Sequence, residues 1–394
     1  MRLPASVASL SSIVVFLAIL FLACCGSNNS GVELGAGGSG GSGGSGGTSG
    51  TGGSGGTGGS GGTGGSGGTG GSGGTGGSGG GSGGSGGSGS GAMLIRPATG
   101  FDSASEYFAS FKPLQGLVSG GPSRAIVGAR VYVLQANTAR NGDPSISLLT
   151  SATESTRDSI GNYVLTNEDG GFSIAGNYTC TAGHPVYLYV SGGNSGSKGS
   201  NPAIGLMAGL GACPETGTFS AAQPFIFVNE VSTVAAAYAM AGFATDAIHV
   251  SSSGTPRANH GAAEAADLAS VATGFANSSL PSNPEVKVPQ STINTVANIL
   301  AACINSEGPG SSECTTLFRN ARSGGAAGAA PNETASAAIN IAHNPRSNVA
   351  ALYELQPRLG TPFLPALKSA PNDFSLTFED ESAGNSVASA AYRP

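Results

Sequence analysis

The sequence has little charge and no tryptophan. Among its 394 residues only 10% are Asp, Glu, Lys or Arg. Lys and Arg number 16 against 22 Asp and Glu, which gives a formal net charge of −6 at pH 7. Binding to nucleic acid requires a basic surface that neutralises phosphates. The composition therefore argues against a nucleic-acid partner.

Residues that commonly bind metals or carry catalysis are also scarce. The four histidines do not lie at metal-ligand spacing from one another: His184, His249, His260 and His343. No Cys-x-x-Cys or Cys-x-x-His sequence occurs, so we predict no zinc site and no metal or other cofactor. Glu168 and Asp169 could bind Ca²⁺ with turn carbonyls, but the EF-hand pattern is absent. We therefore favour a solvated turn over a Ca²⁺ site at Glu168 and Asp169.

The N-terminus has the parts of a secretory signal. Arg2 provides a positive start, residues 7–23 are largely apolar, and two cysteines follow. Residues 22–25 (Leu-Ala-Cys-Cys) look like a bacterial lipobox, which directs cleavage before a cysteine that becomes lipidated. We favour Cys25 as the lipidated residue, with Cys24 as the alternative, and predict a signal peptide over residues 1–25. An ordinary cleaved signal and an uncleaved anchor stay open, because 17 residues are just long enough to span a membrane.

A glycine-rich tract occupies residues 26–93. From Gly35 to Gly91, 37 of 57 residues are glycine, in repeats of Gly-Gly-Ser and Gly-Gly-Thr. Such a tract has almost no side chain to bury, and glycine loses the most backbone entropy on ordering. We therefore predict a disordered, flexible spacer. Gly-Gly-Ser-Gly-Gly matches the nucleophile elbow of hydrolases literally, but that elbow needs a preceding strand and a following helix.

Residues 94–228 show the two-residue alternation of β-strands. We expect strands at residues 129–135, 163–166, 172–174, 185–190 and 224–228. The turn at residues 167–171 contains Asp169-Gly170, a dipeptide that favours a tight hairpin because it tolerates positive φ. Short strands separated by Gly, Asn and Asp clusters predict an antiparallel β-sandwich domain.

Three motifs of this region resemble those of carboxypeptidase-regulatory-like (transthyretin-like) β-sandwiches. They are Gly-Ala-Arg-Val at 128–131, the segment 166–174 that ends in Phe-Ser-Ile, and Val-Tyr-Leu at 186–188. The resemblance implies a structural or ligand-presenting module and brings no catalytic residues with it. A polar insertion at residues 135–160 and Asn167 at a position where Asp is commoner depart from the family pattern.

Residues 229–367 are richer in alanine and predict an α-helical domain. We expect helices at residues 229–240, 262–275, 290–304, 312–322, 332–343 and 345–356. The clearest is 290–304, where apolar residues recur on one helical face and Ser291 is the expected cap. Residues 368–394 follow as a C-terminal tail. The predicted fold class is therefore α+β, with a β-sandwich followed by an α-helical domain.

Residues 94–378 as a whole resemble the N-terminal region of uncharacterised bacterial secreted proteins. The segments Val228–Ala235, Pro289–Thr295 and Ile339–Pro345 carry this likeness. In those proteins the region often precedes an NHL-repeat β-propeller. No propeller sequence follows here, so we expect no propeller-borne activity to transfer.

Four cysteines remain beyond the lipobox pair, and they allow three pairings. An exported chain reaches an oxidising compartment, where disulfides form. We predict Cys180–Cys213 within the sandwich and Cys303–Cys314 across the turn between two helices.

Two functional hypotheses follow. The first is a non-enzymatic lipoprotein of the bacterial cell envelope that displays a binding or structural module on a flexible tether. Its N-terminal lipid anchor would bind the membrane, and its ligand would be an envelope glycan or protein. No Asp follows Cys24 or Cys25, which favours the outer membrane over inner-membrane retention. The alternative is a secreted hydrolase or carbohydrate-active protein whose site the sequence does not reveal.

Overall fold

The computed structural model describes residues 113–150, 156–175, 178–196, 199–219, 225–253, 261, 264–357, 360–380 and 388–391. All of these residues belong to one compact unit, Ser90–Pro394. The predicted signal segment with Cys24 and Cys25, the spacer at 26–93 and His260 lie outside the described residues.

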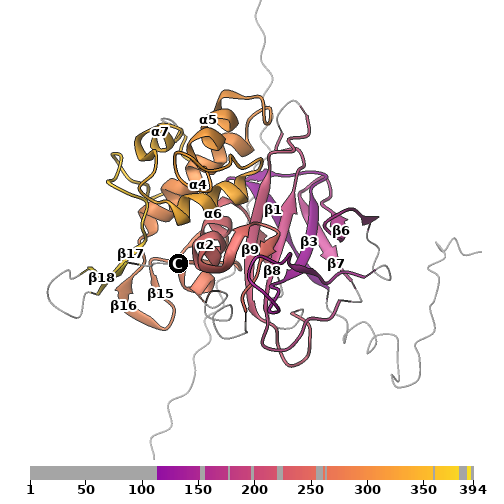
Figure 1. Ribbon diagram of the computed structural model, residues 1–394. Coiled ribbons are helices and arrows are strands. Elements are labelled where there is room, and N and C mark those ends of the chain that lie inside the picture. The colour runs from indigo at the N-terminus through magenta and orange to yellow at the C-terminus, as the bar shows by residue number, and fades with distance from the viewer. Residues whose placement is uncertain are drawn as a thin grey trace, which may run out of the picture. The chain divides into compact units, whose positions relative to one another are not determined.

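Two β-sheets occupy the first half of the described chain (Figure 1). The larger sheet contains β3 (Arg130–Gln135), β4 (Ile146–Ser147), β5 (Thr156–Arg157), β6 (Asn162–Leu165), β8 (Pro185–Ser191) and β9 (Gly205–Ala212). Its strands run antiparallel in the order β5-β6-β3-β8-β9, and β4 pairs with β3. The smaller sheet contains β1 (Leu114–Gly120), β2 (Arg124–Ala125), β7 (Gly171–Ile174) and β10 (Ile226–Val228).

The central strands of the larger sheet are buried on both faces. In β3 every residue from Val131 to Gln135 is buried, and β8 is buried over its first six residues. Strands that are covered on both faces read as continuous apolar runs, which explains why the sequence marks β3 and β8 clearly. The expected strands at 129–135 and 185–190 are confirmed to within one residue.

The smaller sheet departs from the prediction in two respects. Strands β1 and β10 pair in parallel, with Gly116 opposite Ile226, so the sheets are not wholly antiparallel. The expected turn at residues 167–171 is present, and Gly170 has φ +76°. However, β6 pairs with β3 and β7 pairs with β1. The Asp169-Gly170 turn therefore carries the chain from one sheet to the other and does not close a two-stranded hairpin.

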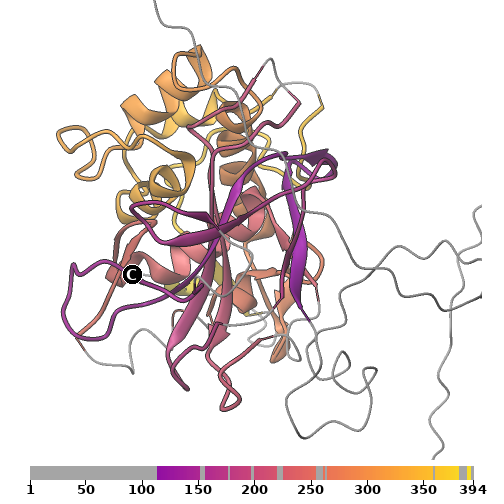
Figure 2. The same ribbon diagram turned by 90° about the vertical axis from the view of Figure 1, so that its right-hand side faces the viewer.

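Most of the regular structure after β10 is helical, and Figure 2 shows these helices beside the sheets. Their bounds are α2 (Glu230–Met240), α4 (Gln290–Ile304), α5 (Ser312–Asn320), α6 (Thr334–His343) and α7 (Val349–Tyr353), with a 3₁₀ turn η1 (Ala241–Phe243) after α2. Asn229 caps α2 in a capping box with Ser232. The predicted α4 matches at both ends, but its expected cap is wrong. Pro289 takes the N-cap position without a side-chain bond, and Ser291 lies in the first turn.

The predicted helix at 262–275 is also wrong over its second half. Helical backbone ends at Leu268, and a short hairpin of β13 (Ala269–Ser270) and β14 (Phe275–Ala276) follows. The side-chain amide of Asn277 donates to the carbonyls of Ala266 and Asp267, at 2.8 and 2.9 Å. These carbonyls would otherwise accept bonds from the next helical turn, so Asn277 ends the helix.

Two further small sheets complete the described fold. One pairs β11 (Ala244–Asp246) with β12 (His249–Val250), and the other has the order β15-β16-β17-β18 with bounds Ser279–Leu280, Asn283–Lys287, Thr377–Asp380 and Ala388–Ala391. Strand β17 comes from the segment that the sequence suggested as a tail. Phe374 and Leu376, just before it, are fully buried, so this segment belongs to the core.

One cluster of buried side chains runs through sheets and helices alike. Helix α2 is buried along its whole length and packs against β9. At the outer edge of β9, the Thr233 and Thr334 hydroxyls accept from the backbone N–H groups of Met207 and Gly205, at 2.9 and 3.0 Å. The edge strand is thereby capped by helix side chains instead of a further strand. No helix among the described residues is long and apolar enough to cross a membrane.

Candidate functional site

Both predicted disulfides are present in the structure. Cys180 pairs with Cys213, which follows β9, and the two Cα atoms lie 5.9 Å apart. Cys303 near the end of α4 pairs with Cys314 in the first turn of α5, with a Cα separation of 4.5 Å. All four cysteines are buried. Disulfides persist in oxidising compartments, so the pair indicates a location outside the cytoplasm.

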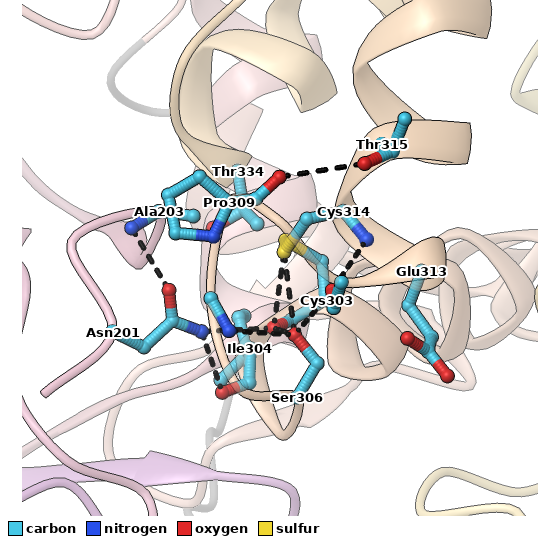
Figure 3. Close-up of a disulfide and its surroundings, with 12 residues drawn as sticks. Asn201, Ala203, Cys303, Ile304, Ser306, Pro309, Glu313, Cys314, Thr315 and Thr334 are labelled. Atoms are coloured by element: carbon cyan, nitrogen blue, oxygen red, sulfur yellow. Dashed lines mark hydrogen bonds between the residues drawn. A yellow bond between two sulfur atoms is a disulfide. The ribbon is translucent and has the colours of Figure 1, made fainter. Parts of the chain in front are cut away.

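The second disulfide lies where the sheets meet the helices (Figure 3). Asn201, fully buried in the connection from β8 to β9, donates its amide to the carbonyls of Cys303 and Ile304, at 2.9 and 3.2 Å. These carbonyls end α4 and have no partner within the helix. Ser306 also donates to the Cys303 carbonyl, at 2.7 Å. Asn201 and Ser306 thus satisfy the carbonyls at this end of α4, which is a structural role.

The structure does not bring the described histidines into a shared site. His184 accepts at Nδ1 from the Gln135 amide at 3.4 Å, and His249 contacts Asp246 at 2.9 Å. His343 bonds the Ala241 carbonyl through Nε2 at 2.6 Å. Within the described residues, no group of three or more His, Cys, Asp and Glu side chains could hold a metal ion.

Glu230 is the most deeply buried carboxylate, with no exposed surface. It occupies the first turn of α2, where the helix dipole favours a negative charge. Both of its oxygens lie 2.9 Å from the backbone nitrogen of Gly121, in the turn between β1 and β2. Burial raises the pKa of Glu230 to about 7, although the backbone N–H groups oppose this shift. The carboxylate therefore connects α2 to the smaller sheet.

Glu333 performs a similar task at the start of α6. Its carboxylate accepts from the backbone N–H groups of Ala335 and Ser336, at 2.6 and 2.7 Å, as the N-cap of the helix. Burial raises the pKa of Glu333, the N–H donors lower it, and the charge of Asp246 adds to the rise. In contrast, Glu168 and Asp169 are exposed in their turn, as expected for a solvated turn.

One spacious cavity in the described part of the chain is one that the sequence did not indicate. It has a volume of about 620 Å³ and lies where η1 and β11 meet the segment after β12 and the end of α6. We call it the serine pocket. Its polar and aromatic lining residues are Asn141, Phe243, Thr245, Ser251, Ser252, Ser253 and His343.

Hydrogen bonds between distant segments fix the walls of the serine pocket. The backbone N–H of Gly142 donates to the Ser251 hydroxyl at 2.7 Å, and that of Ser253 donates to the Asn141 side-chain oxygen at 2.7 Å. The backbone N–H of Ser251 donates to the Phe243 carbonyl at 2.8 Å. The loop after β3 and the segment after β12 are thereby held against each other without side-chain charges.

Two polar groups of the serine pocket retain hydrogen-bonding capacity. Ser252 is 5% exposed, and its hydroxyl makes no hydrogen bond to any described group. The His343 ring must carry its proton on Nε2, because the Ala241 carbonyl can only accept. Nδ1 of His343 has no hydrogen-bond partner among the described residues, and it accepts in the neutral ring and donates in the protonated ring. The pocket combines the Ser252 hydroxyl, the second imidazole nitrogen of His343, the Asn141 amide and the ring of Phe243.

The sequence carries only weak signs of this pocket. His343 stood out as a histidine, but it lies 102 residues from its partner Ala241. The run of three serines at 251–253 is no motif with a known chemistry. No family model matches the chain, and neither a curated protein nor a solved structure is similar to it.

Proposed function

We propose that this protein is a non-enzymatic lipoprotein that displays a folded module on a flexible tether in the bacterial cell envelope. The lipobox-like segment at 22–25 would supply the anchor, with Cys25 lipidated or else Cys24. The glycine-rich residues 26–93 would separate the anchor from the fold by about 40 Å if they behave as a random coil. The oxidising location that the disulfides indicate supports this arrangement.

The hydrogen bonds that the carboxylates accept are the observation that supports a non-catalytic role. Five buried or half-buried carboxylates accept hydrogen bonds from backbone N–H groups: Asp158, Glu230, Asp246, Glu333 and Asp373. A general acid or base needs a titratable group that reaches a substrate. Carboxylates engaged as caps and turn acceptors favour a scaffold over a catalyst.

We further propose the finer architecture that the sequence suggested. The two sheets would form a transthyretin-like β-sandwich of the carboxypeptidase-regulatory kind, and the helices an alanine-rich helical domain. The two sheets support this proposal, and α2 contacts β9 of the larger sheet and β10 of the smaller one. The parallel pairing of β1 with β10 is the departure from an antiparallel sandwich.

Mass spectrometry of the mature protein tests the anchor. We expect an N-terminal cysteine that carries acyl chains, at Cys25 or at Cys24. The variant in which both cysteines are serine should lose the lipid and leave the membrane fraction. An intact Met1 terminus in the mature protein would contradict the anchor proposal.

An activity screen tests the absence of catalysis. The purified protein should turn over no glycan, ester or peptide substrate, with divalent metals supplied. Reproducible turnover that His184→Ala or His343→Ala abolishes would replace this proposal with the alternative, a secreted hydrolase or carbohydrate-active protein.

A further inference from the structure

We infer that residues 103–111 form a short amphipathic helix that docks on an exposed aromatic face of the smaller sheet. The inference goes beyond the proposed function, because it concerns how the spacer joins the fold and does not depend on the lipid anchor. It stands on an uncovered sheet face and on the sequence of the segment that enters the fold beside it.

The face of the smaller sheet that points away from the core carries large apolar side chains. Leu117 of β1 lies opposite Phe227 of β10. Both are half-buried, whereas their neighbours along each strand are buried. Phe225, two residues before Phe227, is 39% exposed, and the centroids of these two rings lie 5.1 Å apart. We call these three side chains the aromatic face.

The hairpin of β13 and β14 adds a further exposed ring beside the aromatic face. The backbone N–H of Phe227 donates to the Val271 carbonyl at 2.7 Å. Gly274 is so close to Phe227 that a Cβ at Gly274 would lie 3.0 Å from the Cβ of Phe227. Phe275 follows directly and is 54% exposed. Exposed apolar surface that is contiguous in this way marks a place where another segment or partner binds.

The chain that precedes the described fold arrives next to this surface. Pro113 is the first described residue, directly before β1. Gly116 lies opposite Ile226 in the parallel register, so Gln115 lies beside Phe225, one residue earlier on each strand. The preceding segment therefore joins the fold only a few residues from the aromatic face.

The sequence of this segment predicts an amphipathic helix. Ser103 and Glu106 have the spacing of a capping box, which marks the start of a helix. Pro113 disfavours helical backbone at the residue before it, which sets the end. Between these limits apolar side chains recur at i, i+3, i+4 and i+7, on one helical face: Ala104, Tyr107, Phe108 and Phe111.

Such a helix needs a surface to pack on. A helix shorter than about 12–15 residues is marginal in water by itself, and burial of its apolar face supplies the missing stability. The aromatic face offers rings of the same kind within reach of Pro113. Residues 220–224, which lead into Phe225, are Ser-Ala-Ala-Gln-Pro and bring no large apolar side chain to cover it. Docking would also fix the point at which the spacer leaves the fold.

The test uses tryptophan as a reporter, because the protein contains none. Phe225→Trp places the reporter on the aromatic face. Ile146→Trp is the matched control in β4, where the parent residue is 43% exposed against 39% for Phe225. The full chain is measured with phosphatidylcholine vesicles present. We expect bluer emission and weaker quenching by acrylamide for Phe225→Trp than for Ile146→Trp.

Two further variants place the helix on this face. Phe108→Asp puts a charge on the apolar side of the helix, and Ala109→Asp puts the same charge on its opposite side. Phe108→Asp should expose the Phe225→Trp reporter and speed hydrogen exchange at residues 104–111 by about tenfold, the effect of losing one buried aromatic side chain. Ala109→Asp should change neither. The Ile146→Trp reporter should be the same in both backgrounds, which shows that the fold is intact.

Four results would overturn the inference. Two of them are equal quenching of the two reporters and exchange at residues 104–111 that Phe108→Asp leaves unchanged. Shielding of the Phe225→Trp reporter that rises with protein concentration would show that a second copy covers the face. Quenching of that reporter by brominated acyl chains would show that the bilayer does. The tethered lipoprotein proposal stands or falls separately, because its test is the lipidated cysteine.

Discussion

Glu230 shows how one residue can couple folding to pH. It has no exposed surface, forms no ion pair with a described residue, and binds the turn between β1 and β2 through Gly121. A buried carboxylate of this kind disfavours its charged form. The cost of ionisation is therefore carried by the folded state alone.

Stability should consequently fall as pH rises through the titration of Glu230. The pKa is about 7 in the folded protein against an ordinary value of 4.5, so the folded state binds more protons between these values. The contribution of Glu230 to the free energy of unfolding is highest below pH 4.5 and is lost as pH rises to about 7, by about 3 kcal/mol.

Urea unfolding of the parent and of Glu230→Gln over this pH range measures the effect. Glutamine still accepts from Gly121 but does not ionise, so the difference between the two proteins isolates Glu230 from other groups. A pH dependence that is identical in both would contradict the assignment.

Gly205 at the start of β9 makes a second residue-scale prediction. A Cβ at this position would collide with Oε2 of Glu333 and lie 3.2 Å from the Ala335 nitrogen. Gly205→Ala should therefore displace the N-cap of α6 and cost about 1–3 kcal/mol. Thermal unfolding checks this against Gly199→Ala, where a Cβ meets no atom within 4 Å. Equal melting temperatures for the two variants would refute it.

At the scale of elements, β9 depends on helices for its outer edge. Gly205 donates to the Thr334 hydroxyl at 3.0 Å, and that hydroxyl donates to the Gly205 carbonyl at 2.6 Å. Without these helix side chains the edge of β9 would be exposed, and an exposed strand edge is a template for pairing with other chains. The helix hydroxyls therefore protect the sheet as well as join it to α6.

Thr334→Val tests this edge with a side chain of nearly the same shape. We expect a loss of about 1–3 kcal/mol, because a buried N–H of β9 is left without a partner. Thr315→Val, at an exposed threonine of α5, is the control and should change stability little. Hydrogen exchange at Gly205 gives a direct readout, and unchanged protection there would rule the role out.

At the scale of the whole molecule, the shared core predicts cooperative unfolding. Buried side chains of the sheets and of α2, α4 and α6 form one cluster, and β9 is covered by α2. A boundary between residues 228 and 229 would expose apolar surface on both sides of the cut. Neither part would then retain a complete core.

Calorimetry should accordingly show one unfolding transition for the intact protein. Fragments 94–228 and 229–394 produced separately should lack fixed tertiary structure, and mixing them should restore part of the folded signal. Two well-separated transitions, or two fragments that fold independently, would show that the sandwich and the helices are autonomous.

The local pattern of the sequence was sufficient for several elements. The apolar stripe predicted α4, the two-residue alternation predicted β3 and β8, and the alanine-rich run from residue 229 predicted α2. Each of these signals involves residues a few positions apart, whose burial or capping follows from strand and helix periodicity.

Tertiary structure alone decided the rest. Strand β9 contains glycines that weaken its signal, and it forms because β8 pairs along its whole length. The sequence indicated the turn at Gly170, but it did not indicate that the chain passes there from one sheet to the other. Gly121 and Glu230, and likewise Gly142 and Ser251, meet across 109 residues of sequence. Contacts at such separations leave no periodic trace, because they depend on how completed elements pack and not on their own residues. The serine pocket belongs to this class.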